Sequence, residues 1–264
     1  MPVPYDSTTS YKGGARHGPK AIIAASRQLE DYDLELDRDL SEVGIWTAPE
    51  IEPDASGPEA MVERVERVVR SVAGPGRLVG LLGGEHSVTT GAVRALKGLY
   101  PDMSVLYLDA HADLRDEYMG TPWGHASVAR RLHEMCDIVQ VGVRSLSAHE
   151  RRFIREVGLP VTFWPPSVTD RRELHSRVLE ALSPRVYISI DLDVFDPSTM
   201  AAVGTPEPGG LGWEDVTGLL RAVCGQREIV GFDVTELSPD EGPEACAFSA
   251  AKLTYRLIGY ATPS

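Results

Sequence analysis

The sequence predicts an α/β fold in which helices cover both faces of a mostly parallel central sheet. Short apolar runs typical of buried strands alternate with longer amphipathic stretches typical of helices. The strands are apolar along nearly their whole length, which favours parallel strands that are covered on both faces. The 264 residues contain no internal repeat or low-complexity linker, so we expect a single domain over residues 1–264.

The first part of the chain is more polar than the rest. A polar loop opens it, and Pro19 fits the first turn of a helix that continues towards Leu29. The acidic segment 30–42 is expected to be a solvated surface stretch. A helix is predicted over Pro58–Val72, where apolar residues form one stripe, and Gly74-Pro75-Gly76 ends it.

From residue 78 onward, predicted strands and helices alternate. The expected strands are 78–82, 105–108, 138–143, 161–164, 186–190 and 229–234. The expected helices are 88–99, 125–135, 148–157, 171–182, 213–223 and 245–260, and a Gly/Pro-rich loop spans 197–212. Ligands in such sheets bind beyond the carboxyl ends of the strands, so polar residues at these ends are candidates for a functional site.

Charge and cysteine usage narrow the classes of function. The formal net charge of −13 argues against nucleic acid or an anionic membrane as a partner, and it favours a cationic small molecule. Cys136, Cys224 and Cys246 have no metal-binding or disulfide spacing and are expected to be reduced thiols. Neither a signal peptide nor an apolar run of about 20 residues is present, which favours a cytoplasmic location.

Three polar motifs follow three of the predicted strands. Asp109, His111 and Asp113 follow one strand, and alternate residues of an extended chain can share a face. Asp191 and Asp193 follow a second strand, and Gly83-Gly84-Glu85-His86-Ser87 follows a third. Carboxylate and imidazole ligands without thiolates suit hard or borderline divalent ions such as Mn²⁺. The motifs therefore predict a two-metal hydrolytic centre.

Together these motifs resemble the ureohydrolases, the arginase and agmatinase family, and they are most similar to agmatinases. The resemblance covers nearly the whole chain and includes the opening segment 5–29, the loop 204–210 and the strand end Asp233-Val234-Thr235-Glu236. It implies the three-layer arginase/deacetylase-like fold, with a metal site at the carboxyl ends of the strands. It also implies a homo-oligomer, either a trimer or a hexamer.

The resemblance implies two Mn²⁺ ions per subunit and six metal ligands. One ion would be held by His86, Asp109, Asp113 and Asp191. The other would be held by Asp109, His111, Asp191 and Asp193, so that two aspartates bridge the ions. Several carboxylates are needed to offset the repulsion between two dications, and a water bridging them is acidified towards hydroxide, the nucleophile for a guanidinium carbon.

Four residues match the positions that handle the substrate and its protons in this family. Glu236 would hold the guanidinium group through paired charge-assisted hydrogen bonds, and Thr205 would lie near the substrate. His125 would act as the proton shuttle for the departing amine, and Asp113 would also orient the hydroxide. Glu85 replaces the aspartate usual in its motif and is expected to support the site without binding metal. Asp196 precedes Pro197 and is expected to be a turn residue.

The expected reaction is hydrolysis of agmatine to putrescine and urea. The loop 114–123 resembles agmatinases more than arginases, and Asp116 and Glu117 in it could receive a distal ammonium group. The alternative substrates are guanidinobutyrate, guanidinopropionate or arginine, and Arg115 is a conceivable partner for a carboxylate. Alternatives from other classes are a metallophosphoesterase, an amide hydrolase related to deacetylases and a non-catalytic binding homologue.

The start of the chain departs from the family pattern. Family members usually carry an apolar strand before the Pro4-Tyr5-Asp6 loop, whereas this sequence begins only a few residues upstream of it. The first strand is therefore expected to be shortened or missing.

Overall fold

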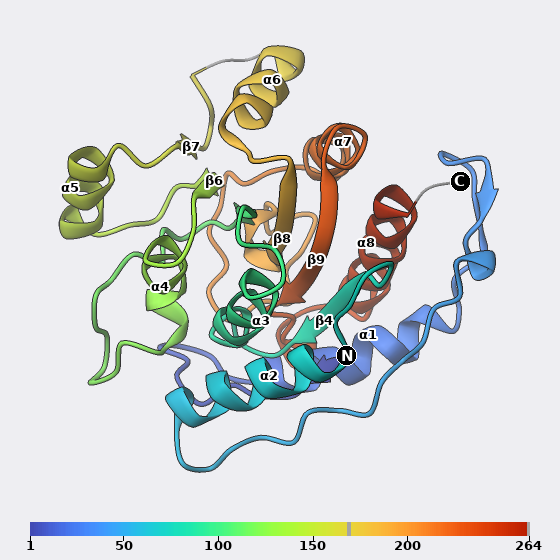
Figure 1. The fold of residues 1–264 in the computed structure, drawn as a ribbon, viewed down its shortest axis with the longest axis horizontal. Coiled ribbons are helices and arrows are strands. Elements are labelled where there is room, and N and C mark those ends of the chain that lie inside the picture. The colour runs from blue at the N-terminus through green and yellow to red at the C-terminus, as the bar shows by residue number, and fades with distance from the viewer. Residues whose placement is uncertain (168–169, 263–264) are drawn as a thin grey trace.

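The computed structural model describes residues 1–167 and 170–262, and its centre is a seven-stranded sheet (Figure 1). The strand order is β1-β4-β9-β8-β5-β6-β7, and every pair of neighbours in it is parallel. The strands are β1 (Pro2–Val3), β4 (Val79–Gly83), β5 (Ser104–Leu108), β6 (Ile138–Val143), β7 (Val161–Phe163), β8 (Arg185–Asp191) and β9 (Glu228–Thr235). The predicted mostly parallel sheet is confirmed.

Helices cover the sheet on both faces, and each face has its own apolar core (Figure 1). One core packs helices α1 (Gly18–Ser26), α6 (Arg171–Ala181), α7 (Trp213–Cys224) and α8 (Ala245–Ala261) against the strands. The other packs α2 (Pro58–Val72), α3 (Val88–Lys97), α4 (Val128–His133) and α5 (Ala148–Val157). Burial on both sides explains why the central strands are apolar at consecutive positions.

The helix predicted over 125–135 is shorter than expected. Residues His125–Ser127 form a single 3₁₀ turn, and α4 begins only at Val128. Gly124, which precedes this turn, has an extended conformation, and a Cβ atom at this position would lie 3.2 Å from Thr8 Oγ1. A predicted site histidine thus lies on a short turn beside the opening segment of the chain.

The expectation that residues 30–42 form a solvated stretch is wrong for part of the segment. The segment contains a two-stranded antiparallel sheet of β2 (Tyr32–Asp33) and β3 (Arg38–Asp39). Asp33 is fully buried, and its Oδ2 lies 2.8 Å from Lys252 Nζ and 3.2 Å from Arg256 Nε, both on α8. Because two cations of a distant helix compensate this carboxylate, its burial could not be read from the local acidic composition.

The opening segment lies directly against the end of β4. The backbone N–H of Gly84 donates to Val3 O at 2.8 Å, and that of Glu85 donates to Tyr5 O at 2.7 Å. A Cβ atom at Gly84 would lie 2.0 Å from Tyr5 O, so only glycine permits this approach. The glycine therefore allows the segment that begins at β1 to lie close to the candidate site motif that follows β4.

No helix in the described ranges is long and apolar enough to cross a membrane.

Candidate metal centre and active site

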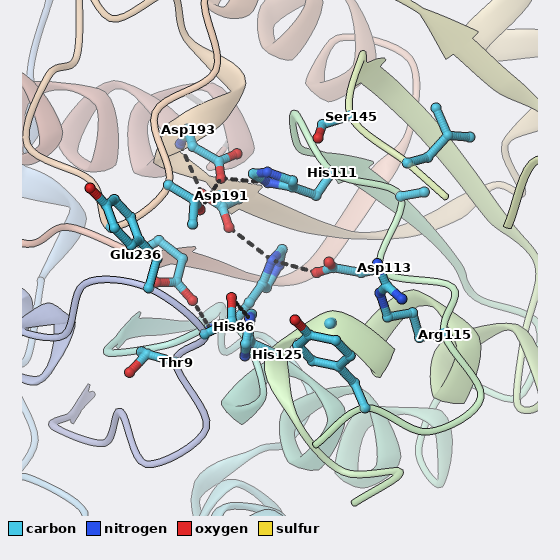
Figure 2. Close-up of a pocket in the computed structure, with 18 of the residues that line it drawn as sticks. Thr9, His86, His111, Asp113, Arg115, His125, Ser145, Asp191, Asp193 and Glu236 are labelled. Atoms are coloured by element: carbon cyan, nitrogen blue, oxygen red, sulfur yellow. Dashed lines mark hydrogen bonds and ion pairs between the residues drawn. The ribbon is translucent and has the colours of Figure 1, made fainter. Parts of the chain in front are cut away.

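Four neighbouring strands deliver the candidate site residues to one edge of the sheet. His86 follows β4, Glu236 follows β9, Asp191 ends β8, and Asp109 follows β5. These strands are adjacent in the order β4-β9-β8-β5, and their parallel direction brings their carboxyl ends together. Side chains from four distant parts of the sequence therefore line one cavity with a volume of about 270 Å³ (Figure 2).

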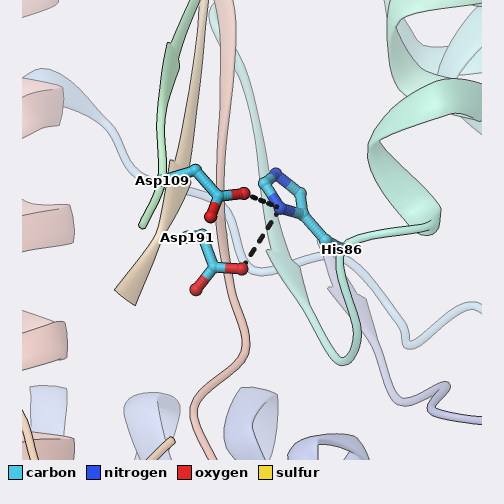
Figure 3. Close-up of side chains that lie close together, drawn as sticks. All are labelled: His86, Asp109 and Asp191. Carbon is cyan, nitrogen blue, oxygen red and sulfur yellow. Dashed lines mark ion pairs between the residues drawn. The ribbon is translucent and has the colours of Figure 1, made fainter. Parts of the chain in front are cut away.

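His86, Asp109 and Asp191 form the first group of potential metal ligands (Figure 3). His86 Nδ1 lies 3.1 Å from Asp109 Oδ2 and 3.2 Å from Asp191 Oδ2. Asp113 approaches the same nitrogen with its Oδ2 at 3.6 Å. All four side chains are buried, so the group forms a small, enclosed set of oxygen and nitrogen donors.

Asp109, His111 and Asp193 form the second group, which shares Asp109 with the first. His111 Nδ1 lies 2.8 Å from Asp193 Oδ2 and 3.6 Å from Asp109 Oδ1. Within each group the potential ligand atoms lie within 4.8 Å of one another. The six residues expected from the resemblance are therefore close together, in two overlapping groups with Asp113 beside the first.

A chain of buried hydrogen bonds determines which nitrogen of His86 carries a proton. Tyr187 donates to Asp233 Oδ2 at 2.6 Å, and Ser189 donates to Asp233 Oδ1 at 2.8 Å. Since the single hydroxyl proton of Ser189 is used in this bond, its Oγ can only accept from His86 Nε2, which lies 2.8 Å away. His86 therefore carries a hydrogen on Nε2. Its Nδ1 faces the two aspartates and the hydroxyl of Tyr107, which lies 3.0 Å away and donates to Asp113 Oδ2 at 2.8 Å.

This arrangement fits a divalent cation. In neutral His86 the Nδ1 lone pair would face carboxylate oxygens of Asp109 and Asp191, and Asp109 Oδ2 is buried without a hydrogen-bond partner. A cation among these atoms would replace their mutual repulsion with attraction. The donors are carboxylate oxygens and imidazole nitrogens without thiolates, a set that suits Mn²⁺ and similar ions.

The pKa values of the cluster show the same excess of negative charge. Burial and the negative charges of Asp193 and Asp109 raise the pKa of Asp191 well above its ordinary value. Burial and Asp109 raise the pKa of Asp113 as well. Burial would lower the pKa of His86, but the adjacent carboxylates of Asp109 and Asp191 outweigh it and raise this pKa. Without a metal, the cluster thus retains protons that a cation would displace.

Glu236 lies beside the metal-ligand groups and lines the same cavity. Its Oε1 accepts a hydrogen bond from the backbone N–H of His86 at 2.6 Å, which orients the carboxyl group (Figure 2). Its φ of +66° is in the left-handed region, which is rare for a residue with a long side chain. Burial, together with Asp191 and Glu85, raises its pKa, so this carboxyl group would gain from a cationic partner.

His125 and Thr205 also line the cavity. His125 Nδ1 lies 3.3 Å from Thr8 Oγ1, and its Nε2 lies 3.2 Å from Ser10 Oγ. Burial, with the positive charge of His111, lowers the pKa of His125 to about 4. A proton shuttle would be expected to have a pKa near neutrality. Thr205 Oγ1 lies 3.5 Å from Asp193 Oδ2, at the edge of the second group.

The family model for the "Arginase family" matches residues 1–259. The chain belongs to the arginase family. The N(1)-aminopropylagmatine ureohydrolase of Synechocystis sp. is 38% identical over 98% of this chain and 87% of its own length. The protein of the same name from Thermus thermophilus is 43% identical over 98% of this chain and 88% of its own length. The agmatine ureohydrolase structure from Thermoplasma volcanium superimposes with a TM-score of 0.90 at 34% identity, covering 98% of this chain and 88% of its own.

Membership of the arginase family confirms the resemblance and excludes the metallophosphoesterase alternative.

Two of the four described non-glycine residues with positive φ are in the candidate site, Asp113 at +50° and Glu236 at +66°. Asp196 does not belong to either ligand group. Its carboxylate accepts from the backbone of Ser198, Gly209 and Gly210, so it holds the loop as a turn residue.

Two acidic residues do not lie where the sequence led us to expect, and several residues that support the candidate site were not predicted. Asp116 pairs with Arg131 at 2.6 Å, and neither Asp116 nor Glu117 lines the cavity. The supporting roles of five residues were not predicted from the sequence: Thr8, Tyr107, Tyr187, Ser189 and Asp233. Four of them are polar residues inside apolar strands, a signal that could have indicated them, whereas nothing local distinguishes Thr8.

Proposed function

We propose that this arginase-family hydrolase cleaves the guanidinium group of N1-aminopropylagmatine and releases urea. The observation that carries the proposal is the placement of Glu236 in one cavity with two groups of metal ligands. A carboxylate and a guanidinium form paired, charge-assisted hydrogen bonds, and only Oε1 of Glu236 has a partner among the described residues. A bound guanidinium would therefore be held beside the ligand groups.

Two divalent ions, which we propose to be Mn²⁺, would acidify a water molecule for attack on the guanidinium carbon. The residues proposed to hold them are His86, Asp109, His111, Asp113, Asp191 and Asp193. Glu236 would bind and orient the substrate, and Thr205 would lie next to it. These groups act by positioning the carbon, and positioning accounts for a large share of the rate in such reactions.

The reaction adds water to the guanidinium carbon and breaks the bond between this carbon and the alkyl-substituted nitrogen. The departing nitrogen must gain a proton to leave as an amine, and the carbon leaves as urea. His125 is neutral at pH 7 because its pKa is lowered to about 4. It would therefore first accept a proton released from the attacking water and then return it to the departing nitrogen.

The identity of the amine arm rests on two supports. The two ureohydrolases at 38% and 43% identity carry the name of N(1)-aminopropylagmatine. The net charge of −13 favours a substrate with several positive charges.

Agmatine, which is the substrate expected from the sequence, is the second candidate. The solved structure from Thermoplasma volcanium, at 34% identity, is named for agmatine. Both substrates share the guanidinobutyl group, so the same metal and guanidinium contacts would serve them. They differ only in the arm beyond the first amine.

Urea release would be measured with the Mn²⁺-loaded protein on N1-aminopropylagmatine, agmatine, arginine and guanidinobutyrate. We expect the highest kcat/KM with N1-aminopropylagmatine and a loss of about 100-fold or more in Glu236→Gln, which removes one charge of a buried pair. Asp191→Asn should abolish activity, and the surface substitution Glu180→Gln on α6 should leave it unchanged. Higher kcat/KM with agmatine would support the second candidate. Urea from guanidinobutyrate alone, lost in Arg115→Met, would refute a polyamine substrate.

We also propose that the protein is a homo-oligomer, either a trimer or a hexamer, and that it is cytoplasmic. Chromatography with light scattering tests the homo-oligomer, and cell fractionation tests the cytoplasmic location. The three free cysteines are consistent with a reducing compartment.

A further inference from the structure

The hydroxyl of Thr8 connects the opening segment of the chain to His125. Thr8 Oγ1 donates to Glu85 Oε1 at 2.6 Å. It also accepts the backbone N–H of His125 at 3.0 Å and lies 3.3 Å from His125 Nδ1. These three partners use the full bonding capacity of a hydroxyl group, which has one proton and two lone pairs.

The direction of the Thr8–Glu85 bond follows from the surroundings of Glu85. Its Oε2 accepts the backbone N–H of Thr8 at 2.7 Å, and its Oε1 accepts hydroxyl protons from both Thr8 and Ser87, the latter at 2.5 Å. Every partner of this carboxylate is therefore a donor. Because the Thr8 proton is used in this way, Thr8 Oγ1 can only accept from His125 Nδ1, which must then carry the hydrogen.

We propose that Thr8 is a positioning residue that keeps the hydrogen of His125 on Nδ1, so that Nε2 is the nitrogen that exchanges protons during catalysis. The part concerning catalysis rests on the proposed function, whereas the position of the hydrogen does not. Nε2 faces Ser10 Oγ, which lines the same cavity, and Ser10 can donate to its lone pair. Glu85, Thr8 and His125 thus form a short chain that ends at the cavity.

Nitrogen NMR of the histidine-labelled full-length protein tests the position of the hydrogen directly. The spectrum is recorded metal-free and again with diamagnetic Mg²⁺, and His125→Gln assigns the signals. We expect Nδ1 to be protonated in the wild type. In Thr8→Val, which keeps the backbone bond to Glu85 and the side-chain shape, the hydrogen should move largely to Nε2. A wild-type His125 protonated on Nε2, or an unchanged hydrogen position in Thr8→Val, would overturn the proposal.

Kinetics test the consequence for catalysis. Thr8→Val should lower kcat by about 100-fold, the usual contribution of a correctly placed acid or base, while KM changes less than about threefold. Thr8→Ser restores the hydroxyl and should recover both the spectrum and most of kcat. Thr217→Val removes a buried threonine hydroxyl, which donates to Trp213 O within α7, and should change neither. A shifted hydrogen position with unchanged kcat would refute the catalytic part alone, and absence of urea release from the wild type would refute only the proposed function.

Discussion

The hydroxyl of Ser189 should control how tightly His86 binds a metal ion. Ser189→Ala removes the 2.8 Å bond to His86 Nε2 and the 2.8 Å bond to Asp233. His86 would then have a buried N–H without a partner, and its ring would keep only its stacking on Tyr107 and its contacts at Nδ1. Loss of such a partner typically weakens metal binding by about 10- to 100-fold, or about 1.4–2.8 kcal/mol. The unpaired N–H should also reduce the free energy of unfolding by about 1–3 kcal/mol.

Calorimetric titration of Mn²⁺ into chelator-treated protein would measure the affinity, and urea unfolding of the metal-free protein would measure the stability. Ser104→Ala is the matched control. Ser104 is a buried serine of β5 whose Oγ accepts from Ser183 N at 2.9 Å, at the opposite end of the sheet from the metal ligands. It should lower stability without changing the affinity for Mn²⁺. An affinity equal to that of the wild type in Ser189→Ala would refute the argument that the Ser189–Asp233 chain prepares His86 for a metal.

Two further predictions concern pH and backbone packing. His125 titrates at about pH 4 in the folded protein against an ordinary value of 6.5. The unfolded state therefore binds more protons between these values, and the free energy of unfolding should fall as the pH falls from 6.5 to 4. Urea unfolding of the metal-free protein should show a smaller fall in His125→Gln than in the wild type, and equal falls would contradict the assignment. Gly84→Ala should cost several kcal/mol because its Cβ would lie 2.0 Å from Tyr5 O. Gly98→Ala, in a helical conformation with its nearest atom at 3.4 Å, is the control, and equal unfolding midpoints for the two variants would disprove the close approach.

The local sequence was sufficient to predict most of the fold. The apolar runs that end at Leu82, Leu108 and Ile190 correspond to strands, because a strand buried on both faces needs apolar residues at successive positions. The motifs after these strands predicted a common edge, because parallel strands present their carboxyl ends together. The prediction was wrong for part of residues 30–42, where Asp33 is buried by Lys252 and Arg256 from the far end of the chain.

The sequence by itself determined which chemical groups this protein can use, since Asp109, His111, Asp191 and Asp193 stand in short motifs with recognisable spacing. The tertiary structure alone decided how these groups are supported. Thr8 meets Glu85 across 77 residues and His125 across 117 residues, and Ser189 meets Asp233 across 44. These contacts depend on the strand order β4-β9-β8-β5 and on the opening segment that crosses Gly84. The proton positions on His86 and His125 are set by hydrogen bonds between residues far apart in the chain, and a local pattern carries no record of them.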